Sequence, residues 1–180
     1  MNILVVNGSP KGQYSVTLQT INYLMKLYGE HNFEILHAGQ RIKALERDFT
    51  PAKQALEKAD LIIFSYPVYT FIAPYQLHRF IEIIKEQGID LKGKAATQFS
   101  TSKHFYDVTA HRYVEDNCFD LGLNYVRGLS ADMDDLLSEK GQKEARDFFE
   151  YVLYCINNGI YEKCRVNPTE PKHVKVTVPN

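Results

Sequence analysis

Short, unbroken runs of apolar residues constrain the fold of this chain most strongly. Residues 61–64 are Leu-Ile-Ile-Phe, and residues 3–6 are Ile-Leu-Val-Val. A strand with one wetted face alternates apolar and polar side chains, so an unbroken run indicates a strand that is covered on both faces. Between such runs the apolar residues recur three and four positions apart, as they do from Ile21 to Tyr28, which is the spacing of a helix. The chain is therefore expected to alternate strands and helices around a parallel sheet.

This pattern predicts five strands, each followed by a helix, within residues 1–160. The strands are expected at residues 2–7, 33–37, 61–64, 94–99 and 125–129, and the helices at 15–29, 50–59, from Pro74 onward, 107–121 and 141–157. Right-handed crossovers then produce a doubly wound five-stranded parallel α/β sheet with helices on both faces. We expect residues 1–160 to form one domain. Residues 161–180, which are polar and rich in proline, are expected to form a C-terminal extension, with a strand-like alternation at 173–178.

Charge and cysteine content narrow the possible partners. The 21 basic and 22 acidic residues leave a net charge of −1, so we expect no nucleic-acid partner and no anionic membrane partner. No apolar stretch is long enough to span a bilayer, and no secretory signal opens the chain. Three cysteines without a CxxC pair favour a reducing, cytoplasmic location. The histidines show no ligand spacing, so we expect no metal.

The loop that follows the first strand predicts a phosphate site. It carries one cation and several hydroxyls: Ser9, Lys11, Ser15 and Thr17. A helix that begins directly after such a loop offers unpaired N–H groups and the positive end of its dipole to an anion. The alternative is a plain strand-to-helix connection in which Ser15 is an ordinary N-cap. The loop lacks the glycine pattern of a Rossmann dinucleotide site and the ending of a Walker A motif.

Two further loops are expected at the same edge of the sheet, because the carboxyl ends of parallel strands lie together. Residues 65–74 contain three aromatic side chains, Tyr66, Tyr69 and Phe71, which could form the wall for a planar ring. A core position or a dimer contact is the alternative for these aromatics. Residues 100–106 supply hydroxyls and an imidazole, or alternatively only a helix-capping turn.

Together the three loops resemble the flavodoxin-like NAD(P)H-dependent FMN reductase family over roughly residues 1–132. The resemblance rests on Gly8-Ser9-Pro10-Lys11 with Ser15-Val16-Thr17, and on Pro67-Val68-Tyr69 followed by Pro74-x-x-Leu77-x-x-Phe80-Ile81. It implies that FMN is the cofactor. The phosphate would be bound by Ser9, Lys11, Ser15, Val16 and Thr17, the ring flanked by Pro67, Val68, Tyr69, Thr70 and Phe71, and its polar edge met by Ser100, Thr101 and His104. Relatives often carry arginine in place of Lys11 and tryptophan in place of Thr70.

The resemblance implies hydride transfer from NADH or NADPH through FMN to a small acceptor such as a quinone, a free flavin or another electrophile. No catalytic side chain is assigned, because the flavin accepts hydride directly and the protein has only to position the two rings. A homodimer is expected. Two alternatives stay open, a flavodoxin-type electron carrier without its own NAD(P)H reactivity and a non-catalytic phosphate-binding module. The net charge of −1 lacks the acidic surplus with which carriers dock onto basic partners, which favours the enzyme.

Overall fold

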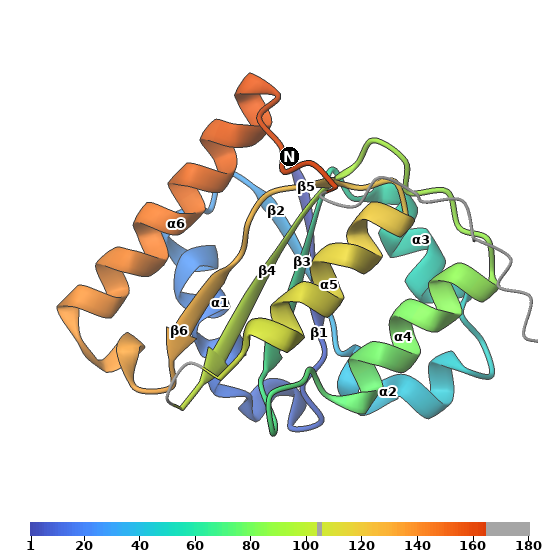
Figure 1. The fold of residues 1–180 in the computed structure, drawn as a ribbon, viewed down its shortest axis with the longest axis horizontal. Helices are drawn as coiled ribbons and strands as arrows, with labels where there is room; N and C mark the ends of the chain where they lie inside the picture. Colours follow the sequence, from blue (N-terminus) through green and yellow to red (C-terminus); the bar gives the residue numbers. More distant parts are fainter. Residues whose placement is uncertain (104–105, 165–180) are drawn as a thin grey trace, which may run out of the picture.

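A computed structural model describes residues 1–103 and 106–164 of the chain (Figure 1). Its sheet is parallel and has the strand order β2-β1-β3-β4-β5, with β6 also paired to β4. The strands are β1 (Asn2–Asn7), β2 (Asn32–Leu36), β3 (Leu61–Pro67), β4 (Ala95–Ser102), β5 (Asn124–Tyr125) and β6 (Leu129–Asp132). The predicted doubly wound parallel sheet is confirmed.

Helices cover both faces of this sheet (Figure 1). One face carries α2 (Ala38–Leu45), α3 (Thr50–Lys58), α4 (Tyr75–Glu86) and α5 (Val108–Asp120). The other face carries α1 (Val16–Leu27) and α6 (Glu139–Asn158), and two short 3₁₀ helices, η1 (Gly12–Tyr14) and η2 (Asp135–Leu137), complete the chain. None of the helices in these described ranges is both long and apolar enough to cross a membrane.

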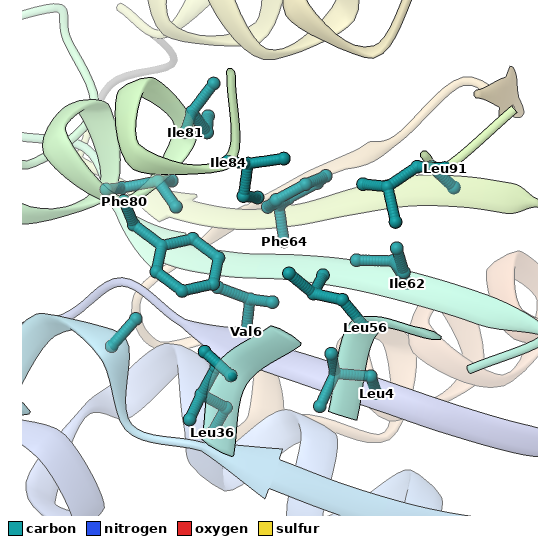
Figure 2. Close-up of a cluster of buried hydrophobic side chains, with 14 of the residues drawn as sticks. Leu4, Val6, Leu36, Leu56, Ile62, Phe64, Phe80, Ile81, Ile84 and Leu91 are labelled. Atoms are coloured by element: carbon teal, nitrogen blue, oxygen red, sulfur yellow. The ribbon is translucent and has the colours of Figure 1, made fainter. Parts of the chain in front are cut away.

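The unbroken apolar strands are explained by two separate cores. Leu4 and Val6 pack into the cluster on the α2–α5 face, part of which is drawn in Figure 2, whereas Ile3 and Val5 pack against α1 and α6. Successive side chains of a strand point to opposite faces, so a strand between two layers can bury apolar residues at successive positions, as β1 does. The polar ends of the strands are consequently the part of the sheet that is available for chemistry.

The fifth strand position is occupied by two short strands instead of the predicted single strand at 125–129. The chain leaves the ladder between β5 and β6 at Gly128, which lies against Gln98 of β4. A Cβ atom on Gly128 would lie 2.4 Å from the carbonyl oxygen of Gln98, which is closer than atoms can approach. The hydroxyl of Tyr125 accepts hydrogen bonds from the Gly128 N–H (3.3 Å) and from the Gln98 amide. The break between β5 and β6 therefore coincides with the contact of Gly128 with Gln98, which lies far away in the sequence.

The helix α2, which the apolar pattern did not predict, packs against the loop after β1. Gly39 in α2 packs so closely on this loop that a Cβ atom there would lie 2.3 Å from the Ser9 carbonyl oxygen and 2.6 Å from that of Gly8. Both neighbours are backbone atoms and cannot rotate away. The position of the loop after β1 thus depends on a glycine 30 residues further along the chain.

We expect Gly39→Ala to lower the free energy of unfolding by about 1–2 kcal/mol, because the overpacking penalty exceeds the helix-propensity gain of alanine. Gly29→Ala is the matched control, since nothing lies within 4 Å of its Cβ position, and it should change stability little or raise it slightly. Urea unfolding of the two variants measures the difference. Equal stability of both would contradict the close packing of α2 on the loop.

Candidate functional site

A cavity of about 380 Å³ opens at the carboxyl ends of β1, β3 and β4. The predicted site residues that line it are Ser9, Lys11, Ser15, Val16, Pro67, Val68, Tyr69, Thr70, Phe71 and Thr101. All three predicted loops therefore contribute to one site, as expected where parallel strands end together. His104 falls outside the described residues.

Asn7, the last residue of β1, holds the first loop in shape. Its amide nitrogen donates to the carbonyl oxygen of Gly12 (3.0 Å) and to Nδ1 of His37 (3.2 Å), and its amide oxygen accepts from the Ser9 N–H (3.1 Å). The Ser9 hydroxyl in turn accepts from the Lys11 N–H (3.2 Å). Sequence reasoning did not single out Asn7. The signal was available, because an asparagine that directly follows an unbroken apolar strand is expected to be buried and to need hydrogen-bond partners, and Asn7 is fully buried.

Ser15 precedes α1 and has a polar atom without a partner. The residue is 1% exposed, and its hydroxyl forms no hydrogen bond within the described chain. It stands at the N-cap position, yet its side chain accepts no capping hydrogen bond. The first N–H groups of α1 have no carbonyl acceptor within the helix, because no helical turn precedes them. Ser15 therefore does not cap the helix in the ordinary way, which was the alternative to a phosphate site. Its hydroxyl and the first N–H groups of α1 are donors suited to an anionic oxygen.

The second loop folds back in a tight turn at Tyr69–Ile72. The N–H of each of these two residues donates to the carbonyl of the other, at 3.0 and 3.2 Å. The two residues between them have positive φ, 49° for Thr70 and 72° for Phe71, which is a conformation that favours glycine or asparagine. The Val68 N–H donates to the Thr101 carbonyl (2.9 Å) and ties the loop to β4. Backbone strain of this kind is concentrated at binding sites.

Three residues of the sequence interpretation lie outside the cavity lining. Thr17 uses its hydroxyl in a buried hydrogen bond with that of Thr101 (2.6 Å). Ser100 is bonded to Nε2 of His111 (2.7 Å) and points to the α5 side of β4. Direct contact of Thr17 and Ser100 with a cofactor stays a prediction. Tyr66, expected in the aromatic wall, is fully buried in the core and donates to Gln98 Oε1 (2.5 Å).

The cavity lining also includes four residues that the sequence analysis did not single out: Ser102, Lys103, Tyr106 and Met133. Lys103 donates to Asp134 (2.5 Å) and lies 3.7 Å from Asp132, and the hydrogen bond to Asp134 raises the pKa of Lys103. Tyr106 packs edge-on against Phe71, with ring centroids 5.6 Å apart. The position of Lys103 beside the end of β4 was available from the sequence, whereas Met133 enters the site only because β6 pairs with β4 as far as Asp132.

We expect Thr70→Gly to raise the free energy of unfolding by about 0.5–1 kcal/mol, because relief of strain outweighs the added flexibility of the unfolded chain. Thr70→Ala keeps a Cβ atom at positive φ and should not reproduce this gain. Denaturant unfolding of both variants measures the effect. A less stable Thr70→Gly variant would show that the turn is not strained.

Comparison with solved structures finds the same fold in several proteins. An NADH:FMN oxidoreductase in its apo form is 19% identical, with a TM-score of 0.70 over 84% of this chain and 87% of that one. An NADPH-quinone reductase from P. pentosaceus is 16% identical, with a TM-score of 0.66 over 86% and 97%. An FMN-dependent NADH-azoreductase from Bacillus anthracis, solved with FMN, is 15% identical, with a TM-score of 0.61 over 89% and 100%.

No curated protein matches the sequence. A family model described as a flavodoxin-like fold matches residues 1–134, which hold all three loops of the cavity. The strand order, the coverage of both faces and the site at the carboxyl ends of the strands agree with that match. This chain belongs to the flavodoxin-like fold family.

Proposed function

We propose that this chain binds FMN and uses it to transfer hydride from NADH or NADPH to a small acceptor. The observation that carries the proposal is the continuity of one cavity, in which the donors around Ser15 and Lys11 adjoin an apolar wall at residues 67–71. A ligand that carries both a phosphate and a flat ring needs donors for the phosphate and an apolar wall for the ring in one cavity. Proteins of the same fold whose names include FMN, an azoreductase and an NADH:FMN oxidoreductase, support the same ligand.

The first loop fits the phosphate of FMN. The unpartnered hydroxyl of Ser15 and the first N–H groups of α1 supply donors, and Lys11 supplies a positive charge beside them. Burying a hydroxyl without a partner costs free energy, which a phosphate oxygen would recover. Val16 adds its N–H as the first residue of the helix. We keep Thr17 among the phosphate-binding residues on the family resemblance, and its hydroxyl bond with Thr101 joins the phosphate loop to the loop after β4.

The second loop fits the ring system. Pro67 and Val68 continue β3 into the cavity, and Tyr69 and Phe71 present half-exposed aromatic faces there. Thr70 is small where relatives often have tryptophan, so it leaves space for a second ring beside the first. Thr101 and Lys103 provide polar groups on the β4 side of the cavity. We assign Ser100 and His104 to the polar edge of the ring on the family resemblance alone, although the Ser100 hydroxyl is bonded to His111 on the α5 side of β4.

When bound, FMN accepts hydride from a nicotinamide ring and passes an electron pair to an acceptor. The side chains around the cavity have to orient two flat ligands and exclude water, and none is required to form a covalent bond. Lys103 adds an ammonium donor to the cavity lining, and Asp132 and Asp134 lie against that ammonium group. We assign no catalytic residue.

An electron carrier of the flavodoxin type is the second candidate. Such carriers dock onto basic partners through strongly acidic faces, and the net charge of −1 does not favour that mode. The small side chain of Thr70 in the cavity lining also leaves a nicotinamide room to approach. Both observations favour an enzyme whose acceptor is a quinone, a free flavin or another small electrophile.

Exposed apolar side chains around the cavity mouth favour a homodimer. Phe71, Ile72, Tyr75 and Tyr106 are each 47–67% exposed, and Val108 beside them is 78% exposed. Exposed apolar groups of this kind are typical of protein interfaces.

We further propose residues 1–160 as the FMN-binding domain and 161–180 as a C-terminal extension. Within it, the Glu162 N–H donates to the carbonyl oxygen of Tyr125. The buried thiols Cys118 and Cys155 suit a reducing, cytoplasmic location.

Replacing Lys11 and Ser15 separately by alanine should weaken FMN binding by about tenfold or more in each variant, the value of a charge-assisted hydrogen bond. Lys26→Ala removes the same charge from the far end of α1 and should leave the affinity unchanged. Titration of the flavin-free protein followed by flavin fluorescence measures the dissociation constants. Wild-type affinity in both site variants would exclude this loop as the phosphate site.

NADH or NADPH should bleach the flavin absorbance of the loaded protein within seconds under anaerobic conditions. Thr70→Trp should slow this step by covering the open side of the ring, while FMN affinity is retained because the phosphate contacts are intact. Stopped-flow absorbance with each nucleotide measures the rate. If neither nucleotide bleaches the flavin, the electron-carrier alternative replaces the enzyme.

A further inference from the structure

A second cavity, of about 420 Å³, lies between the first half of α5 and the segment that joins β5 to β6. Its lining is polar and shares no residue with the first cavity. The lining residues that matter here are Asp107, His111, Glu115, Tyr125, Arg127 and Ser130. A water molecule occupies about 30 Å³ in the liquid, so the cavity is large enough for a small organic molecule.

Asp107 lines this cavity and has a carboxylate oxygen that is buried without a partner. Its side chain is 9% exposed, and Oδ2 has no hydrogen-bond partner in the described chain. Asp107 stands at the N-cap of α5, where an aspartate ordinarily accepts from the helix N–H groups, yet it accepts no capping hydrogen bond. Its carboxylate is therefore not used by the helix. A buried acceptor left unpaired is costly, and a cationic N–H donor satisfies it best.

The imidazole of His111 lies beside this carboxylate but has a closer hydrogen-bond partner. Nε2 of His111 lies 2.7 Å from the hydroxyl of Ser100 and 3.5 Å from Oδ2 of Asp107. Burial lowers the pKa of His111 from its usual 6.5, against the opposing effect of Asp107. Glu115 and Glu162 add two further carboxylates to the lining, and Glu115 lies 3.9 Å from Arg112. The carboxylate oxygen that is buried there without a hydrogen-bond partner is Oδ2 of Asp107.

Arg127 gives the same cavity a cationic edge. It is exposed, and no ion pair links it to another residue of the described ranges. Arg112, by contrast, is bonded to Asp116 (3.1 Å) and lies 3.9 Å from Glu115. The hydroxyl of Ser130 is buried without a partner, and that of Tyr125 accepts two N–H groups, which leaves its own hydrogen for another acceptor. Anionic and cationic groups thus face one space with their hydrogen bonds incomplete.

We propose that this second cavity is a binding site for a small zwitterion, with a protonated amine at Asp107 and an anionic group at Arg127. Neither group belongs to the proposed flavin site, so the inference does not depend on FMN binding. The charges disfavour a plain anion, because the carboxylates of Asp107, Glu115 and Glu162 would repel it. They also disfavour a plain cation, which would leave the guanidinium of Arg127 unpaired.

Calorimetric titration of the full chain with amino acids of increasing length tests this site. The probes are glycine, 4-aminobutyrate and 6-aminohexanoate, with butylamine and butyrate as controls that carry one charge each. We expect saturable binding of at least one zwitterion, about tenfold or more tighter than either control. Asp107→Asn and Arg127→Gln should each weaken that binding by about tenfold or more. Asp120→Asn, the same change on α5 but outside the cavity, should not alter it.

Three results would overturn the proposal. These are no saturable binding of any probe, unchanged affinity in Asp107→Asn, and equal weakening by Asp120→Asn. Thermal unfolding identifies any variant that fails to fold, in which case Arg127→Gln decides, since that exposed side chain is not part of the core. Flavin fluorescence recorded in parallel distinguishes the two cavities, because a zwitterion bound at the second one leaves bound FMN in place.

Discussion

Burial of the central strands on both faces is the constraint on which the rest of this structure depends. Strands β1 and β3 lie between two helical layers, so residues 3–6 of β1 and 61–64 of β3 are all apolar. Polar chemistry is then confined to the strand ends, where the backbone turns outward. The first cavity lies at these ends, and three loops distant in sequence meet there because the strands are parallel.

The polar residues at that edge fall into two classes. Asn7, Thr17 and Thr101 are satisfied within the protein and hold the loops in place. Ser15 and Ser102 have buried hydroxyls without a partner, and the exposed Thr70 keeps a strained backbone in the turn beside the cavity. The first class provides rigidity, and the second stores free energy that a ligand can recover. This division supports an organised binding site at one edge of the sheet.

The strand β4 separates the two cavities by the alternation of its side chains. Thr101 points toward α1 and the first cavity, whereas Ser100 points toward α5 and bonds to His111 beside the second. Neighbouring residues of one strand thus serve opposite faces. Two hydroxyls that look equivalent in the sequence consequently have different environments.

Local periodicity in the sequence determined the elements and the class of fold, because the spacing of apolar residues reports directly whether a segment is covered on one face or two. It also placed the loop of Ser9 to Thr17 after a buried strand, which located most of the first cavity. Tertiary structure alone decided that Ser15 and not Thr17 is left without a partner, that Tyr66 belongs to the core, and that Gln98 interrupts the last strand at Gly128. Each of these outcomes depends on contacts between residues far apart in the chain, and a side chain's partner across such a distance leaves no periodic signal in the sequence.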